Sequence, residues 1–200
     1  MIQQVIPSRA KRVPGLGEGA GEGPAVRKRP WLQTLRINLR EFSRDDLGDL
    51  LRLDSDPRVM KYINGGKAMS KNEVEATLRR VTRYYRSVYG LGVWHATRRD
   101  TGAFIGWYCL KYCPPTCDVE VGYRLLHNAW GQGFATEGAT ELVRYGFDDL
   151  GLEKIIGVTH PGNRASQRVL MKAGLDDAGF GRKYYARRLR IFVGHRDWRS

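Results

Sequence analysis

The hydrophobic positions of this chain switch between a period of two and a period of about 3.6 residues. Residues 35–40 alternate apolar and polar side chains, which predicts a first strand. Ser43 precedes two aspartates and a leucine stripe, which predicts the start of a helix. Asp56 and Pro57 then predict a short turn.

The later part of the chain continues in the same way. Ser70 and Glu73 form a capping box at the head of a long amphipathic segment, which Gly90 ends. The remaining predicted elements are strands over 92–97, 103–112, 119–126 and 155–159, helices over 136–150 and 163–173, and closing strands over 183–186 and 189–193. Hairpins come first and a β-α-β unit follows, so we expect one α+β domain with a mixed sheet.

Residues 1–30 depart from this pattern. They hold five glycines at alternate positions and four prolines, together with six basic and two acidic residues. Such a segment buries little and loses much entropy when it is ordered, so we expect a flexible basic tail before a domain over 31–200. An arm that contacts a partner, or an overlong start of the chain, is the alternative.

Charge gathers toward the two ends of the chain. The formal net charge is +13, of which residues 182–200 carry +6 and residues 1–30 carry +4. The stretch 182–190 mixes arginines with two tyrosines, a composition that favours contact with RNA or the ribosome, although a hairpin with a charged outer face explains it equally well. No apolar run reaches the roughly 18 residues of a membrane span, and the N-terminal residues have no apolar segment of the kind that secretory signals carry, so we expect a cytoplasmic protein without a membrane partner.

The residue types that bind metals do not gather in the sequence. Cys109, Cys113 and Cys117 are an odd number of thiols with two prolines between them, which fits a reducing compartment and a turn. The four histidines are scattered and lack the spacing of a metal motif. We therefore expect no metal site.

The segment with the clearest chemistry lies between a predicted strand and a predicted helix. It reads Trp130, Gly131, Gln132, Gly133, Phe134, Ala135, Thr136, Glu137. Small residues at alternate positions let the backbone approach a ligand closely, and the free N–H groups at a helix start attract anions such as a pyrophosphate. A tight turn between a strand and a helix is the alternative.

This segment resembles the acetyl-CoA pyrophosphate loop of the GNAT N-acetyltransferase superfamily, whose pattern is Gln/Arg-x-x-Gly-x-Gly/Ala. Gly133 and Ala135 match the last two positions, whereas Trp130 departs from the first. The Trp-Gly-x-Gly form is similar to the RimJ/RimL-like branch, which includes ribosomal-protein alanine acetyltransferases. Three further stretches also resemble that branch: residues 35–46, 56–62 and 163–174.

The resemblance implies a GNAT fold, an α+β domain whose mixed central sheet has two splayed strands and is flanked by helices. It implies acetyl-CoA as co-substrate, with its pantetheine arm against the backbone of Arg124, Leu125 and Leu126. Asn163 would bond the pantetheine, and Ser166 would lie near the thioester sulfur. The diphosphate would rest on the amides of Gly131, Gln132, Gly133, Phe134, Ala135 and Thr136.

The implied reaction is direct transfer of acetyl to an amine, which must lose a proton before it attacks. Glu120, on the predicted central strand, is the candidate base; a cross-strand ion pair with an arginine is the alternative. Leu170 holds the place where many GNAT enzymes have a tyrosine that protonates the thiolate. Ser166 is the best substitute acid, with a packed small residue as the alternative, and Tyr184 and Tyr185 are further possibilities.

The acceptor is expected to be a protein N-terminal amine or a small amine. The protein itself is expected to be a monomer or a homodimer. A small cationic acceptor would need an acidic pocket, for which the candidates are Asp54, Asp56, Glu73 and Glu75. Aromatic residues that we expect near the acceptor are Tyr62, Trp94, Trp107 and Tyr108. The missing tyrosine and the basic ends also allow a protein that senses acyl-CoA, or binds RNA, without turnover.

Overall fold

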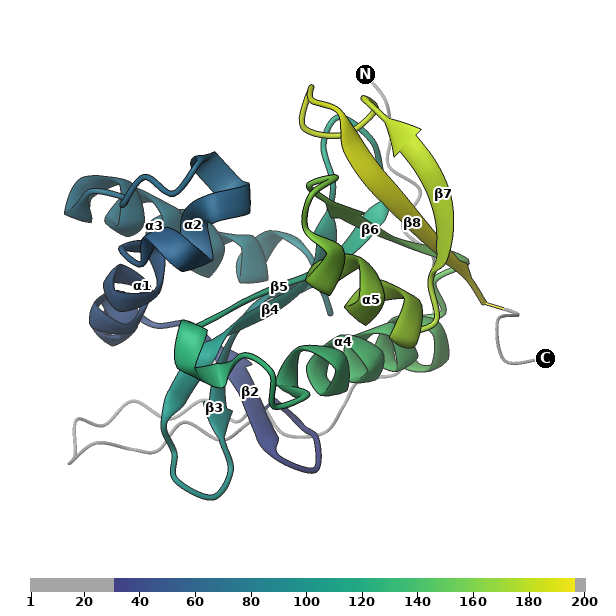
Figure 1. The fold of residues 1–200 in the computed structure, drawn as a ribbon. Coiled ribbons are helices and arrows are strands. Elements are labelled where there is room, and N and C mark those ends of the chain that lie inside the picture. Colours follow the sequence, from purple (N-terminus) through teal and green to yellow (C-terminus); the bar gives the residue numbers. More distant parts are fainter. Residues whose placement is uncertain (1–30, 197–200) are drawn as a thin grey trace.

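One mixed sheet of eight strands organises the computed structural model, which describes residues 31–196 (Figure 1). The expected tail over 1–30 lies outside the described residues. The strands are β1 (Leu32–Gln33), β2 (Ile37–Glu41), β3 (Gly92–Arg98), β4 (Phe104–Tyr112), β5 (Val119–Leu125), β6 (Lys154–Thr159), β7 (Asp176–Gly181) and β8 (Leu189–His195). Their order across the sheet is β1-β2-β3-β4-β5-β6-β8-β7, and every neighbouring pair is antiparallel except β5 and β6.

Five α-helices of the described residues flank this sheet. They are α1 (Leu47–Asp54), α2 (Pro57–Asn64), α3 (Lys71–Ser87), α4 (Phe134–Arg144) and α5 (Arg164–Lys172). Two of them, α4 and α5, lie side by side against one face, where the largest apolar cluster joins them to the central strands (Figure 1). A second cluster packs α1 and α3 against the other face. No helix in the described range has the length and apolar character needed to cross a membrane.

The parallel contact between β5 and β6 is short. Only two register pairs join them, Val119 with Ile155 and Glu120 with Ile156. Beyond these pairs β5 continues to Leu125 and β6 to Thr159 without pairing with each other, so the two strands splay apart. The predicted α+β fold, with a mixed sheet and a splayed strand pair, is confirmed.

Two predicted elements differ from the structure. Pro57 begins the helix α2, because the Asp56 side chain caps it by accepting the Arg58 N–H at 2.9 Å and proline suits a first helical turn. Residues 183–186 are not a strand, since β7 precedes them and they belong to the loop before β8. There the hydroxyl of Tyr184 bonds Asp118, the residue before β5, which holds the segment against that end of the strand instead of in the sheet.

Candidate active site

The glycine loop before α4 has a backbone that only glycine adopts easily. Gly131 and Gly133 have φ angles of 74° and 83°, in the left-handed region, and Gly133 is the residue that precedes the helix. The loop is exposed over residues 130–133. Since the first amides of a helix have no partner within it, the N–H groups of Phe134, Ala135 and Thr136 are the free donors at this end. The loop has the geometry of an anion site.

A clasp from the first hairpin holds this loop in place. The Arg36 guanidinium donates to the Gln132 carbonyl at 2.9 Å and to the Glu137 carboxylate at 2.7 Å, and Thr34 bonds the same carboxylate. Burial raises the pKa of Glu137, but the bonds from Thr34 and Arg36 outweigh it and hold the pKa below its ordinary value. Sequence reasoning missed the role of Arg36, because 101 residues separate it from Glu137.

The backbone of β5 offers hydrogen bonds to the split on alternate residues. The Leu126 N–H bonds the Ile105 carbonyl of β4 at 2.9 Å, so its even-numbered neighbours also face β4. The odd-numbered residues Tyr123 and Leu125 therefore present their N–H and C=O groups to the split. Of the three predicted pantetheine contacts, Leu125 faces the split, whereas the backbones of Arg124 and Leu126 face β4.

The unusual tryptophan of the loop contacts this same edge. The Trp130 indole N–H donates to the Leu125 carbonyl at 2.9 Å. The residue that departs from the expected loop pattern thus fastens the glycine loop to the last residue of β5.

Ser166 and Asn163 lie at the start of α5, across the split from β5. The Asn163 side chain caps the helix by accepting the Ser166 N–H at 3.2 Å. The Ser166 hydroxyl oxygen accepts a bond of 3.1 Å from the Tyr123 hydroxyl. Burial raises the pKa of Tyr123 to about 12, so its hydroxyl keeps its proton at neutral pH. Sequence reasoning missed Tyr123, because its place in the apolar and polar alternation of β5 predicts only a side chain that packs in the core.

Glu120 lies at the point where β5 and β6 begin to part, and its side chain is buried. Its Oε2 atom accepts from Lys111, opposite on β4, at 2.9 Å, and from the Tyr185 hydroxyl. Lys111 also donates to Tyr185 at 2.8 Å. The cross-strand ion pair weighed as the alternative for Glu120 is therefore present, with a lysine in place of an arginine. The Oε1 atom turns toward Gly122, 3.8 Å from where a Cβ would stand.

Two features of this cluster bear on its chemistry. Burial lowers the pKa of Lys111, but Cys109 and Glu120 outweigh it and raise the pKa, so the ammonium stays charged. Burial and then Glu120 raise the pKa of Tyr185, so its hydroxyl stays a donor. Tyr185 also has a φ of 54°, which a residue with a bulky side chain rarely adopts. Backbone strain of this kind persists where neighbours over-determine a conformation, often at functional sites.

The expected aromatic residues divide into two pairs. Trp94 and Tyr108 are core residues, and the Tyr108 hydroxyl donates to the Phe134 carbonyl at 2.7 Å, which anchors α4. Trp107 lies under the Arg124 guanidinium, on the same face as Glu120, at 5.1 Å. Tyr62, on α2, contacts the ring of His160 after β6, with 5.2 Å between ring centroids. The first pair lies in the core, and the second pair lies where α1 and α2 cover the sheet, with Tyr62 alone reaching a residue that follows β6.

The acidic candidates do not form an open acidic pocket. Asp54 is buried against Arg124 at 2.5 Å, and Asp56 bonds Arg58 at 2.6 Å. Glu73 bonds Ser70 in the capping box of α3. Glu75 pairs with Lys71 and Arg79 along the same helix. Each carboxylate already has a cation or a helix start as its partner.

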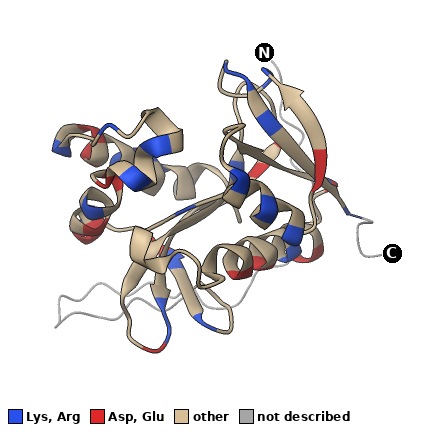
Figure 2. Ribbon diagram, in the orientation of Figure 1, with Lys and Arg blue, Asp and Glu red and all other residues tan. Residues whose placement is uncertain are grey.

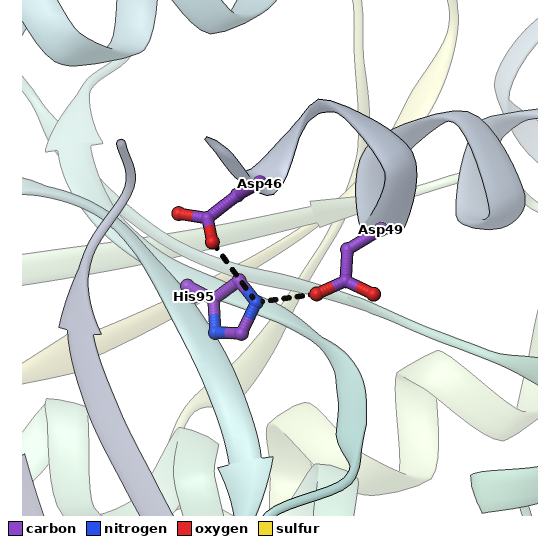
Figure 3. Close-up of side chains that lie close together, drawn as sticks. All are labelled: Asp46, Asp49 and His95. Atoms are coloured by element: carbon purple, nitrogen blue, oxygen red, sulfur yellow. Dashed lines mark hydrogen bonds and ion pairs between the residues drawn. The ribbon is translucent and has the colours of Figure 1, made fainter. Parts of the chain in front are cut away.

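One cluster of the described residues has the donor atoms of a cation site. The Nε2 atom of His95 lies 2.9 Å from Asp49 and 3.8 Å from Asp46 (Figure 3). Arg40 donates to both oxygens of Asp46 at 2.8 Å. The guanidinium supplies the positive charge there, so the residues fit an ion-pair network. Cys109, Cys113 and Cys117 are free thiols, of which the last is exposed.

Comparison with known proteins agrees with this geometry. The sequence model of the "Acetyltransferase (GNAT) domain" family matches residues 36–176. An "FsC-acetyl coenzyme A-N(2)-transacetylase" of Aspergillus fumigatus is 34% identical over 158 residues, which span 75% of this chain and 66% of that protein, just under two thirds of its length. The uncharacterized N-acetyltransferase YoaA of Bacillus subtilis is 30% identical, over 78% of this chain and 88% of its own.

Solved structures share the fold at lower identity. An acetyltransferase from Agrobacterium tumefaciens has a TM-score of 0.72 at 22% identity, covering 88% of this chain and 99% of its own. RimL, a ribosomal L7/L12 alpha-N-protein acetyltransferase solved in complex with coenzyme A, has a TM-score of 0.68 at 13% identity, covering 81% of this chain and 95% of its own.

Proposed function

We propose that this chain, which belongs to the acetyltransferase (GNAT) family, acetylates a primary amine by direct attack on acetyl-CoA in a ternary complex. The observation that carries the proposal is the split between β5 and β6. The glycine loop lies at one end of it, Ser166 lies across it, and Glu120 lies where it begins. A donor with a phosphate head and a thioester tail would place each part against one of these features.

Acetyl-CoA would enter from the side of α4 and α5. Its diphosphate would rest on the loop amides from Gly131 to Thr136, where the helix dipole favours negative charge. Its pantetheine arm would lie along β5 like an added strand, bonded to the outward backbone groups of Tyr123 and to the Leu125 N–H, since Trp130 bonds the Leu125 carbonyl. The Asn163 side chain, which already caps α5, would meet the pantetheine at the other wall.

Glu120 is proposed as the base on the acceptor side. The amine nitrogen attacks the thioester carbonyl carbon, and the carbon–sulfur bond breaks. Oε1 takes the proton that the amine releases, directly or through a water molecule, while Lys111 and Tyr185 fix the carboxylate through Oε2. The ion pair with Lys111 thus orients the base rather than replacing it.

Ser166 is proposed as the acid for the leaving thiolate. Leu170 is buried in the core and has no proton to give. The Tyr123 hydroxyl donates to Ser166 and so turns the serine proton away from itself, toward the split. Once Ser166 protonates the sulfur, Tyr123 is placed to replace the lost proton.

The resemblance to the RimJ/RimL-like branch supports the choice of acceptor class. We propose a protein N-terminal amine or a small amine as the acceptor. A protein that senses acyl-CoA without turnover is the second candidate, favoured by Leu170 in the place of the tyrosine acid.

One kinetic experiment separates these candidates. Release of free thiol is measured with acetyl-CoA and a panel of amines, namely peptides with N-terminal Ala, Ser or Met, lysine and spermidine. Direct attack predicts release with at least one amine and intersecting double-reciprocal plots when both substrates are varied. Parallel plots would indicate an acetyl-enzyme and contradict the mechanism, and acetyl-CoA binding without release from any amine would favour the sensor.

A further inference from the structure

Two basic elements border the Glu120 side of the split. One is the helix α2, and the other is the loop of residues 182–188 between β7 and β8. The Arg187 guanidinium reaches from this loop to the Ile63 carbonyl at the end of α2, over 3.0 Å. Basic positions mark both elements in Figure 2. Tyr185 of the same loop bonds Glu120, so the loop connects these two basic elements to the proposed reaction centre.

The positive charge of helix α2 and of the loop 182–188 is not balanced by nearby carboxylates. The loop 182–188 holds four basic residues and no acidic one. Lys183 pairs with Asp118, and on α2 Arg58 pairs with Asp56. Among residues 31–196, no carboxylate ion pair engages Lys61, Arg182, Arg187 or Arg188. The Lys61 ammonium lies over the ring of Tyr62, and the Arg188 guanidinium lies over the ring of Phe180. We define these four residues as the basic rim.

The acids that could offset the basic rim are occupied. Asp54 is paired with Arg124, and Glu120 is paired with Lys111. These buried pairs add no net charge to the face. An acceptor that approaches it meets positive charge at the rim and a single carboxylate oxygen at the centre.

We propose that the acceptor is the N-terminal amine of a peptide whose next residues are acidic. This inference rests on the proposed function. A peptide advances about 3.3 Å per residue, so carboxylates at its second to fourth positions reach the rim while the amine lies at Glu120. Opposite charge steers such a peptide to the split, and a polycation such as spermidine is repelled. RNA bound to the rim is the competing explanation.

The first test compares three peptides that differ only in charge. Each has N-terminal alanine, then three glutamates, three glutamines or three lysines, and a common tail. The glutamate peptide is expected to exceed the lysine peptide at least tenfold in kcat/KM, and raising the salt from 50 to 500 mM is expected to shrink this ratio severalfold because salt screens exposed charges. Equal rates for the three peptides, or faster reaction of the lysine peptide or of spermidine, would overturn the inference.

The second test locates the preference. The double variant Lys61→Gln with Arg187→Gln is expected to lower kcat/KM for the glutamate peptide about tenfold and to leave the glutamine peptide within twofold. Lys172→Gln, an exposed charge in the last turn of α5, is the matched control and is expected to change neither. An equal fall in kcat/KM for the glutamate and glutamine peptides in the double variant contradicts the proposal. So does a double variant that no longer binds a single-stranded RNA 20-mer but keeps its preference for the glutamate peptide. Failure of every amine to react counts against the proposed function itself, whereas reaction without an acidic preference counts against this inference alone.

Discussion

Gly133 offers a direct test of the glycine loop as the diphosphate site. Its φ is 83°, and a Cβ there would lie 3.3 Å from the Arg36 guanidinium. Gly133→Ala therefore imposes a left-handed conformation on a residue with a side chain and pushes the clasp that holds the loop. The variant adds a single methyl group at the helix start and changes no charge.

The expected cost in stability follows from the backbone. A non-glycine residue in the left-handed region costs roughly 1–2 kcal/mol. The Arg36 guanidinium is the far end of a flexible side chain, so its displacement adds little to that cost. For a chain of this size, about 1 kcal/mol lowers Tm by roughly 2–4 °C, so Gly133→Ala is expected to lower Tm by about 2–8 °C.

Gly151 provides the matched control. Its φ is 68°, and a Cβ there would meet nothing nearer than the end of Arg196, at 4.0 Å. Gly151→Ala therefore carries the same backbone cost between α4 and β6, away from the loop. The two variants should melt at similar temperatures without ligand.

Thermal melting with and without acetyl-CoA separates the two variants. Ligand at 100 times Kd stabilises the wild type and Gly151→Ala by about 2.7 kcal/mol. If the displaced loop weakens binding tenfold in Gly133→Ala, the gain at the same concentration is about 1.4 kcal/mol, and calorimetric titration reads the change in Kd directly. Equal ligand-induced shifts in the two variants would refute the assignment of the loop.

Three further predictions concern the reaction centre and the loop beside it. Glu120→Gln should lower kcat about 10²- to 10⁴-fold, as measured by thiol release, and should leave the affinity for acetyl-CoA unchanged, as measured by calorimetry. A variant with a lower Tm but full activity would show that Glu120 serves only in the ion pair. Ser166→Ala should lower kcat, and Tyr123→Phe should lower it less, while equal activity of both variants and the wild type would contradict the proton-relay role. Since burial raises the pKa of Tyr123 to about 12, its titration should leave the pH–rate profile between pH 6 and 9 unchanged, and a basic limb in that range that Tyr123→Phe removes would contradict the raised pKa. For Asp118, burial raises the pKa, but Lys154, Tyr184 and Lys183 outweigh it and lower the pKa below the unfolded value of about 4. The stability that the Asp118 carboxylate contributes is therefore complete above pH 5 and is lost as the pH falls. Chemical unfolding should show a free energy of unfolding that is higher for the wild type than for Asp118→Asn at pH 7, and this difference should narrow below pH 4.

The glycine loop and the helix cap at Asn163 could be predicted from sequence because local rules determine them. Left-handed glycines and capping side chains act within a few residues, and the pattern there is readable. The strand predicted over 183–186 was wrong for the opposite reason. Hydroxyl bonds to Asp118 and Glu120, more than 60 residues away, decide the conformation of that segment.

The partners of the site residues lay beyond sequence reasoning on the same grounds. Nothing near Glu120 in the sequence indicates that Lys111 and Tyr185 converge on one of its oxygens, because the β4–β5 register and the course of the 182–188 loop bring them there. Likewise, Arg36 becomes a neighbour of the loop only when the first hairpin packs beside α4. Elements could be predicted wherever their own residues specify them, and contacts between elements could not.

The pleat of β5 places Tyr123 and Glu120, which we propose serve the two proton transfers, on opposite faces of the sheet. Tyr123 turns toward α4 and α5, 6.0 Å from the ring of Tyr108, and there it bonds Ser166 beside the proposed path of the thioester sulfur. Glu120, three residues earlier, turns to the other face, toward the acceptor and the basic rim. An odd separation along a strand is required for this arrangement, since a shift of one residue would place Tyr123 and Glu120 on the same face. In the proposed reaction the amine adds to the carbonyl carbon and the thiolate departs from it. Glu120 would take the proton of the amine on one face of the strand, and Ser166, bonded to Tyr123, would protonate the thiolate on the other.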